Sequence, residues 1–174
     1  MPFNLLRVYS ELLELDHLSE TARTKSLRGV FDRDFLNSSQ LVLPAGPVFP
    51  APTPGVPDKL DQLFWHLTTR EIDKATKSKS RDYEAERSRR LHWVRVHILQ
   101  TIADPLTIFE TEDGNSRRLY ILNKSQRYLV VLEPLRKGGG YYLLSAHPLE
   151  PNGYRQIMQK YERAQRAQRR SQRP

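Results

Sequence analysis

The sequence predicts an α+β fold in which N-terminal helices pack on a four-stranded antiparallel meander sheet, followed by a basic C-terminal helix. Two observations predict this fold. Before Pro105 the apolar residues recur mainly with a helical period, and after it they alternate with polar residues. The spacers between the alternating segments are short and rich in turn residues, so neighbouring strands should pair antiparallel.

The start of the chain should be helical and the following stretch a connector. From residue 3 to 28, leucines and Tyr9 are spaced to form an apolar stripe between charged residues. Residues 41–57 hold six of the twelve prolines, whose missing amide donors exclude a helix or a central strand. This stretch is expected to be a semi-rigid connector, or an arm held on the domain by Val48 and Phe49.

Two further helices and a polar loop are expected before the sheet. Asp58 can cap a helix that runs to about residue 68, and residues 74–80 have the polar composition of a loop. The main helix should cover residues 83–103 and end before Pro105, because the residue preceding a proline is pushed out of the helical region.

The main helix has both an apolar stripe and titratable groups. At 100° per residue, one set of aliphatic residues forms a buried stripe, namely Leu91, Val94, Ile98 and Ile102. His92 and Arg95 lie together on one flank and His97 lies on the other. The structural interpretation is that His92 and Arg95 are boundary residues at the rim of the core.

Four strands and a last helix complete the expected fold. The strands should lie at about residues 106–110, 117–122, 127–133 and 141–146, and the helix at about residues 153–170. Alternation places Arg118 and Tyr120 on one face of their strand and Leu119 and Ile121 on the other. If the two aliphatic residues meet the helices, Arg118 and Tyr120 face outward.

Composition excludes several kinds of site. The 174 residues include no cysteine, which excludes disulfides, thiolate zinc sites and cysteine nucleophiles. No HExxH-type spacing supports a metal site, so neither metal nor cofactor is expected. No segment approaches the roughly 20 apolar residues of a membrane span, so a cytoplasmic protein without a membrane partner is expected.

Positive charge is concentrated at the end of the chain. The formal net charge is +8, and residues 154–174 contribute seven basic residues against one acid. The rest of the chain is therefore close to neutral. Such a tail attracts polyanions such as RNA without reading their sequence.

The available side chains suit RNA cleavage by the RNA's own 2′-hydroxyl. That reaction needs a base, an acid and fixed positive charge, but no protein nucleophile and no metal. Histidine suits the base or acid because its reference pKa is about 6.5. The candidate catalytic residues are His92, Arg95, Arg118, Ser145 and His147, and the candidate RNA-binding residues are Tyr120, Arg127, Lys137, Arg155 and Lys160.

The order of these segments resembles a nuclease family. The helix RRLHWVRVHILQTIADPLTIF is followed by RRLYIL, RYLVVLEP, a glycine-rich hairpin, YYLLSAHPL and a final helix that begins NGYRQIM. This order resembles the phage-associated branch of the barnase-EndoU-colicin-RelE nuclease superfamily. That branch has a "dP..I" turn, strands similar to "YYI" and "YLVVV", and a last strand that ends near "TAYP". In this chain Ser145–Pro148, SAHP, stands in the last place.

The resemblance implies a compact, metal-independent ribonuclease, often a toxin that acts on tRNA or other RNA. An acidic antitoxin or immunity protein would neutralise it, in the cytoplasm or in a target cell that receives it. By the same resemblance, His92 or Arg95, Arg118 and Ser145 match functional positions, and His147 replaces the usual aromatic residue. The resemblance covers roughly residues 82–162. The chain as a whole is expected to consist of an N-terminal helical segment and connector (1–57), a nuclease-like domain (58–162) and a basic tail (163–174).

Two other classes of function remain open at this point. The chain could be a non-catalytic RNA-binding or ribosome-associated module, or a phage structural protein with a nuclease-like appendage. The catalytic interpretation makes one geometric demand: His92 and Ser145 should share a single positively charged hollow.

Overall fold

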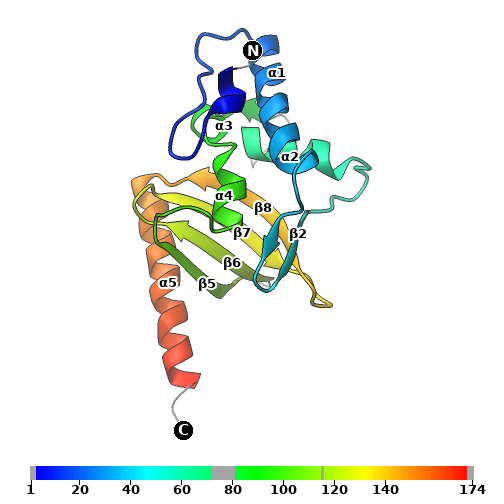
Figure 1. Cartoon of the computed structure of the whole chain (residues 1–174). Helices are drawn as coiled ribbons and strands as arrows, with labels where there is room; N and C mark the ends of the chain where they lie inside the picture. Colours follow the sequence, from blue (N-terminus) through cyan, green and yellow to red (C-terminus); the bar gives the residue numbers. More distant parts are fainter. Residues whose placement is uncertain (1–2, 72–80, 115, 172–174) are drawn as a thin grey trace.

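The protein has an α+β fold in which helices cover one face of a curled, mixed sheet and a long C-terminal helix lies along a border of the other face (Figure 1). The computed structural model describes residues 3–71, 81–114 and 116–171. The α+β class is confirmed, but the expected four-stranded antiparallel sheet is wrong: the sheet has six strands in the order β1-β2-β8-β7-β6-β5.

The expected meander forms one side of the sheet. The six strands are β1 (Val42–Leu43), β2 (Gly46–Pro50), β5 (Leu106–Asp113), β6 (Ser116–Asn123), β7 (Tyr128–Pro134) and β8 (Tyr141–Pro148). Antiparallel pairing joins β5 to β6, β6 to β7 and β7 to β8, whereas β2 runs parallel to β8. A separate antiparallel pair consists of β3 (Thr69–Glu71) and β4 (Arg81–Tyr83). The loop expected at residues 74–80 lies outside the described residues.

The proline-rich stretch contributes β1 and β2. The exclusion of a central strand from this stretch is wrong, because β2 lies between β1 and β8. Pro47 is the second residue of β2 and Pro50 is its last, so the amide of Val48 between them can still bond and donates to the Leu41 carbonyl at 2.8 Å. Val48 is buried in the core, as the alternative of an arm predicted. The fixed φ of proline is compatible with an extended strand near the edge of a sheet.

The N-terminal region is less helical than predicted. A 3₁₀ turn, η1 (Phe3–Leu6), precedes an irregular stretch, and the helix α1 (Glu20–Phe31) starts only after Ser19, whose hydroxyl accepts from the amide of Ala22. A π-helical turn, η2 (Asp32–Leu36), continues it. In the irregular stretch Leu13 and Leu15 are both buried, and the Leu13 amide donates to the Arg89 carbonyl at 3.0 Å. Tertiary packing overrides the apparent helical period here.

The predicted main helix is two short helices. After α2 (Lys59–Thr68), which Asp58 caps as expected, come α3 (Ala85–Ser88) and α4 (Trp93–Ile98), joined by a tighter i→i+3 turn. The end is set at Gln100, with φ of 55°, where the amides of Gln100 and Thr101 bond to the carbonyls of His97 and Val96. The helix therefore ends at this C-terminal cap, several residues before Pro105, and its end is not set by the proline.

Two hydrophobic clusters lie on opposite faces of the sheet. The larger one joins the sheet to α1, α2 and α4 and includes residues from both sides of the boundary expected at residue 57. The smaller one joins β5, β6 and β7 to the long helix α5 (Pro151–Ser171). Figure 1 shows that α5 runs along one border of the sheet and that its C-terminal end extends beyond the strands.

Candidate functional site

Alternation along β6 sends its side chains to the two faces of the sheet. Leu119 and Ile121 lie in the larger cluster beneath the helices, whereas Tyr120 and Leu122 lie in the smaller cluster with α5. Tyr120 is therefore on the predicted face of the sheet, but it does not face solvent as expected, because α5 buries it. We call the face that carries the larger cluster the inner face and the face that α5 contacts the outer face.

Strand register extends the outer face to β8. Val131 pairs with Ser145 and Leu129 pairs with His147, and residues paired across a sheet share a face. Because Val131 and Leu129 contact the α5 cluster, Ser145 and His147 also point to the outer face. Glu133 lies two residues after Val131 and pairs with Tyr142, which places both on this face.

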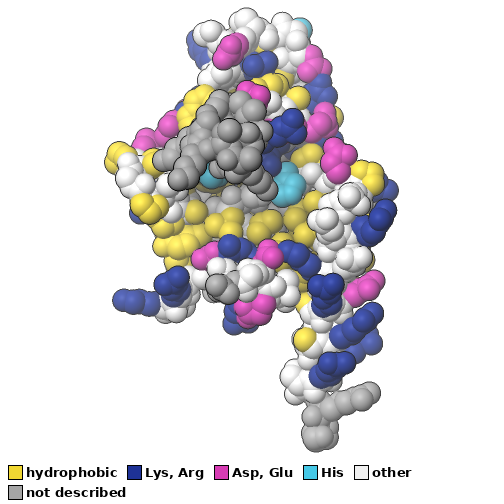
Figure 2. Space-filling view, turned by 180° about the vertical axis from the view of Figure 1, so that it is seen from behind, with side chains coloured by type: hydrophobic (Ala, Val, Ile, Leu, Met, Phe, Trp, Pro, Cys, Tyr) yellow, Lys and Arg dark blue, Asp and Glu magenta, His cyan; other side chains and the backbone are white. Residues whose placement is uncertain are grey.

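Five polar or aromatic side chains lie on the outer face along β6, β7 and β8. We call them the outer site: Arg118, Glu133, Tyr142, Ser145 and His147. All five are partly exposed. Figure 2 views the molecule from behind, where hydrophobic side chains form the middle of the face, basic and acidic side chains border it below, and histidines lie toward its upper part.

Ser145 and His147 form a hydrogen-bonded pair at this site. The Ser145 Oγ lies 2.9 Å from the His147 Nδ1. Burial, and to a smaller extent the positive charge of Arg87, lowers the pKa of His147 to about 4. The imidazole is therefore neutral near pH 7, and the lowered pKa makes it a weaker base than an ordinary histidine. A neutral imidazole that a hydroxyl orients has the geometry of a general base.

The positive charge of the outer site is partly compensated. Arg118 forms an ion pair with Glu133 on the neighbouring strand. Arg87, on α3, donates to the carbonyls of His66 and Thr69 at 2.9 and 3.0 Å, and its charge reaches His147. Sequence reasoning missed Arg87, Glu133 and Tyr142. The strand register could have indicated the last two.

Tyr120 and Lys160 hold α5 on the sheet. Lys160 Nζ donates to the Tyr120 hydroxyl at 3.2 Å and lies 2.9 Å from Asp113, and the Tyr120 hydroxyl donates to Asp113 at 2.9 Å. The bonds from Lys160 and Tyr120 lower the pKa of the Asp113 carboxyl. Both residues were predicted to bind RNA, but their polar atoms already have protein partners.

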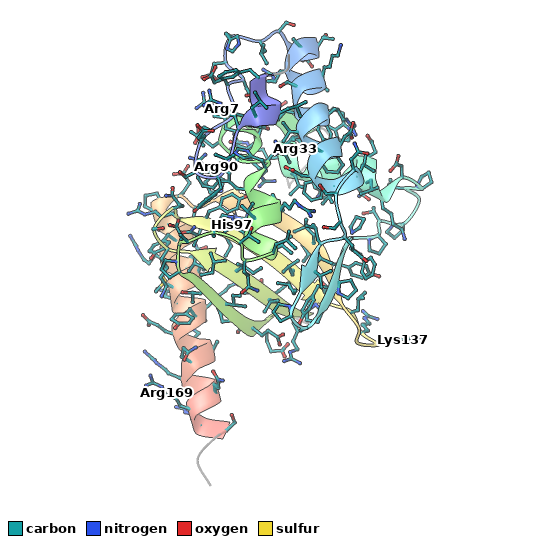
Figure 3. The ribbon with its side chains drawn as sticks, in the orientation of Figure 1. Arg7, Arg33, Arg90, His97, Lys137 and Arg169 are labelled. Carbon is teal, nitrogen blue, oxygen red and sulfur yellow. The ribbon has the colours of Figure 1, made fainter. Side chains whose placement is uncertain are left out.

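The other three predicted RNA-binding residues lie around the rim. Arg127, in the β6–β7 turn, places its guanidinium 5.6 Å from the ring centre of Tyr154 on α5. Arg155 is exposed on the same helix. Lys137 is exposed at the tip of the β7–β8 hairpin, where Figure 3 shows it at the far end from α5.

His92 and Arg95 do not join the outer site. His92 is only 4% exposed and its Nε2 lies 3.2 Å from the Val8 carbonyl, among the N-terminal residues on the inner side. Arg95 donates to the carbonyls of Asp34 and Ser39 at 3.0 and 2.9 Å. The shared hollow expected for His92 and Ser145, both of which lie among the described residues, is absent because the sheet separates them. In these contacts His92 and Arg95 attach the N-terminal region to α4.

A polar network that sequence reasoning missed surrounds His97. Its Nδ1 lies 2.7 Å from the Trp93 carbonyl and its Nε2 3.2 Å from the Asn123 amide nitrogen. The Asn123 amide also donates to Tyr9 and Asp104, at 2.7 and 3.0 Å, and Tyr9 donates to Asp104 at 2.5 Å. These bonds lower the pKa of Asp104. Asp104, which the sequence marks only as the residue preceding Pro105, thus joins the N-terminal region to the sheet.

The described residues do not include a group of three or more His, Asp or Glu side chains placed to hold a metal ion. A hollow of about 640 Å³ lies between η1 and α1, away from the outer site, and its lining includes Phe3, His17 and Lys25.

Among the described helices, none is both long and apolar enough to cross a membrane. Searches against protein-family models, curated proteins and solved structures gave no match for this chain.

Proposed function

We propose that this protein is a metal-independent endoribonuclease whose active site is the outer site. The observation that supports this most directly is the hydrogen bond between Ser145 and His147, formed on the same sheet face as Arg118. Three of the five residues predicted to be catalytic therefore lie on one partly exposed surface. The other two, His92 and Arg95, are excluded from the proposal by their contacts on the inner side. The proposal therefore replaces the hollow expected for His92 and Ser145 with the pair formed by Ser145 and His147.

In the proposed reaction His147 is the general base. This role requires the tautomer in which Nδ1–H donates to the Ser145 oxygen, because Nε2 is then free to accept the proton of a 2′-hydroxyl. The 2′-oxygen then attacks the adjacent phosphorus, the bond from phosphorus to the 5′-oxygen breaks, and that oxygen takes a proton from water. The products are a 2′,3′-cyclic phosphate and a 5′-hydroxyl. Arg118 supplies positive charge to the phosphate oxygens when it turns from Glu133.

The biological setting is part of the same proposal. The cationic residues near the C-terminus favour a polyanionic substrate, and tRNA is the substrate that the family resemblance suggests. An acidic antitoxin or immunity protein would inhibit such an enzyme in the cytoplasm by covering this charge. Growth of a bacterial host that expresses the wild type, compared with His147→Gln, tests the toxin role.

The central experiment is cleavage of total tRNA by the purified chain in EDTA. We expect products with 2′,3′-cyclic phosphate ends. His147→Gln should reduce the rate by about 100-fold or more, as for loss of a general base, and Arg118→Leu should also reduce it. The matched control is His17→Gln, because His17 is exposed on the N-terminal region. Equal rates for His147→Gln and the wild type would contradict the proposed site.

A non-catalytic RNA-binding module is the second candidate. The observation that favours it is α5, whose projecting end carries exposed Arg163, Arg166, Arg169 and Arg170 (Figure 3 labels Arg169). The ion pair of Arg118 with Glu133 also leaves the outer site less cationic than a nuclease site needs. Retention of RNA without any cleavage in the tRNA experiment would favour this candidate.

A further inference from the structure

Two aromatic residues lie side by side on the outer face. In the parallel pairing of β2 with β8, Val48 lies opposite Tyr141 and Phe49 opposite Tyr142. Val48 and Tyr141 are buried in the larger cluster on the inner face. Phe49 and Tyr142 therefore point to the outer face, on neighbouring strands about 4.8 Å apart.

Phe49 is held in place but keeps part of its ring in solvent. The residue is 36% exposed. Its ring packs over Gly140, where a Cβ would lie 3.2 Å from the ring and 2.5 Å from the Pro47 carbonyl oxygen. Only glycine allows β2 to approach the hairpin this closely, and its φ of 149° is one that other residues rarely adopt. The position of Phe49 is thus determined by backbone packing.

The two rings adjoin the polar part of the outer site. Tyr142 pairs with Glu133, the partner of Arg118, and the β8 strand leads from Tyr142 to Ser145 over roughly 10 Å at about 3.3 Å per residue. Arg136 and Lys137 are exposed in the hairpin turn just before β8. The cations of the hairpin turn are thus followed along the chain by Tyr142 and then by the Ser145–His147 pair on β8.

We propose that Phe49 and Tyr142 form a stacking platform for a nucleobase of single-stranded RNA, with the RNA backbone directed along β8 toward Ser145 and His147. The inference rests on the proposed ribonuclease function and defines its substrate as an unpaired segment. Aromatic side chains bind bases through their π faces, which paired and stacked bases of a duplex do not offer. Because every base has such a face, the platform selects for single strands without reading sequence.

The cations around the platform favour RNA over an uncharged peptide. Arg136 and Lys137 lie at one end, and Arg87 lies close enough to His147 at the other end to affect its pKa. Binding should therefore weaken as salt is raised, because phosphate contacts release counterions. A proline-rich peptide that docked on the same rings would show little dependence on salt.

Binding of a short single-stranded RNA that contains 2-aminopurine tests the platform. The measurement uses the full chain with His147→Gln, which prevents cleavage, and follows the quenching of the fluorescent base when it stacks. We expect Tyr142→Leu and Phe49→Leu each to reduce affinity on the order of tenfold and to abolish quenching. Phe3→Leu is the matched control, since Phe3 is 58% exposed on η1; it should bind as the parent does.

A second measurement covers the case in which Phe49→Leu does not fold because it loses its packing on Gly140. Replacing the stacked base by an abasic nucleotide should lower the affinity of the RNA for the His147→Gln parent. The same replacement should not lower the affinity for Tyr142→Leu, which has already lost the stacking contact. Equal affinity of Tyr142→Leu and its parent, equal affinity for duplex and single strand, or salt-independent binding overturns the platform. If binding depends on Phe49 and Tyr142 but the wild type cleaves no RNA, the proposed ribonuclease function is contradicted and the stacking platform is supported. If the wild type cleaves RNA but binding does not depend on these two residues, the platform is contradicted and the ribonuclease function is supported.

Discussion

At the scale of single residues, burial keeps three histidines neutral. It lowers the pKa of His92 and His97, and that of His147 to about 4, all below the usual 6.5. In the unfolded chain these residues take up protons as the pH falls below about 6.5, so the folded state loses stability between that pH and the lowered pKa values. Stability is complete above that window.

The contribution of His147 can be isolated by urea unfolding at pH 7.5 and pH 5. With a folded pKa of about 4, His147 alone should remove about 2 kcal/mol of stability over that interval. His147→Gln should therefore lose about 2 kcal/mol less than the wild type, and exposed His17→Gln should lose as much as the wild type. If His147→Gln instead lost more stability than the wild type between pH 7.5 and pH 5, the burial of a neutral imidazole at this position would be contradicted.

The network around Asn123 makes a second prediction at this scale. Its fully buried amide bonds to His97, Tyr9 and Asp104. Asn123→Ala leaves buried His97 and partly exposed Tyr9 and Asp104 without this partner, and should lower the free energy of unfolding by about 1 to 3 kcal/mol. The control is Asn152→Ala, because Asn152 is exposed at the start of α5. Equal urea midpoints for the two variants would show that the network adds no stability.

At the scale of elements, strands were predicted better than helices. Along β6, alternation gave the right face for Leu119 and Tyr120, because each is decided by its own strand and its two neighbours. The N-terminal helix was wrong because Leu13 and Leu15 are buried in an irregular stretch whose backbone bonds to Arg89 at the end of α3, a contact with no local signal. The site followed the same rule: Ser145 and His147 share a strand, whereas the position of His92 depends on the N-terminal residues that cover it.

The element α5 has two parts with different roles. Up to Tyr161 the helix contacts the sheet. Among the described residues of α5 that follow Tyr161, only Ala164 packs against the smaller cluster, and the arginines are exposed. Removing residues 163–174 should therefore leave the fold intact and shift the melting temperature by only a few degrees. The same deletion should reduce the slope of log binding constant against log salt by about 0.7 for each lost contact with single-stranded RNA. An unchanged slope would mean that this end of α5 does not contact RNA.

At the scale of the whole molecule, one core crosses the domain boundary expected after residue 57. Eight of the 23 buried residues of the larger cluster precede that position, among them Leu13, Phe31 and Val48. The side chain of Trp93 on α4 also donates to the Glu11 carbonyl at 3.0 Å. Residues 58–162 therefore have no complete core of their own.

Residues 58–174 expressed alone should consequently fail to fold. Loss of one large buried side chain typically costs about 2 to 5 kcal/mol, and loss of eight exceeds the roughly 5 to 15 kcal/mol by which a domain is stable. We expect this fragment to give no cooperative urea transition and to bind a dye specific for exposed hydrophobic surface. The chain shortened at the other end, without residues 163–174, is the control and should unfold cooperatively. A cooperative transition in the fragment, with nuclease activity retained, would mean that the N-terminal region is an independent attachment, and that His92 and Arg95 do not owe their positions to it.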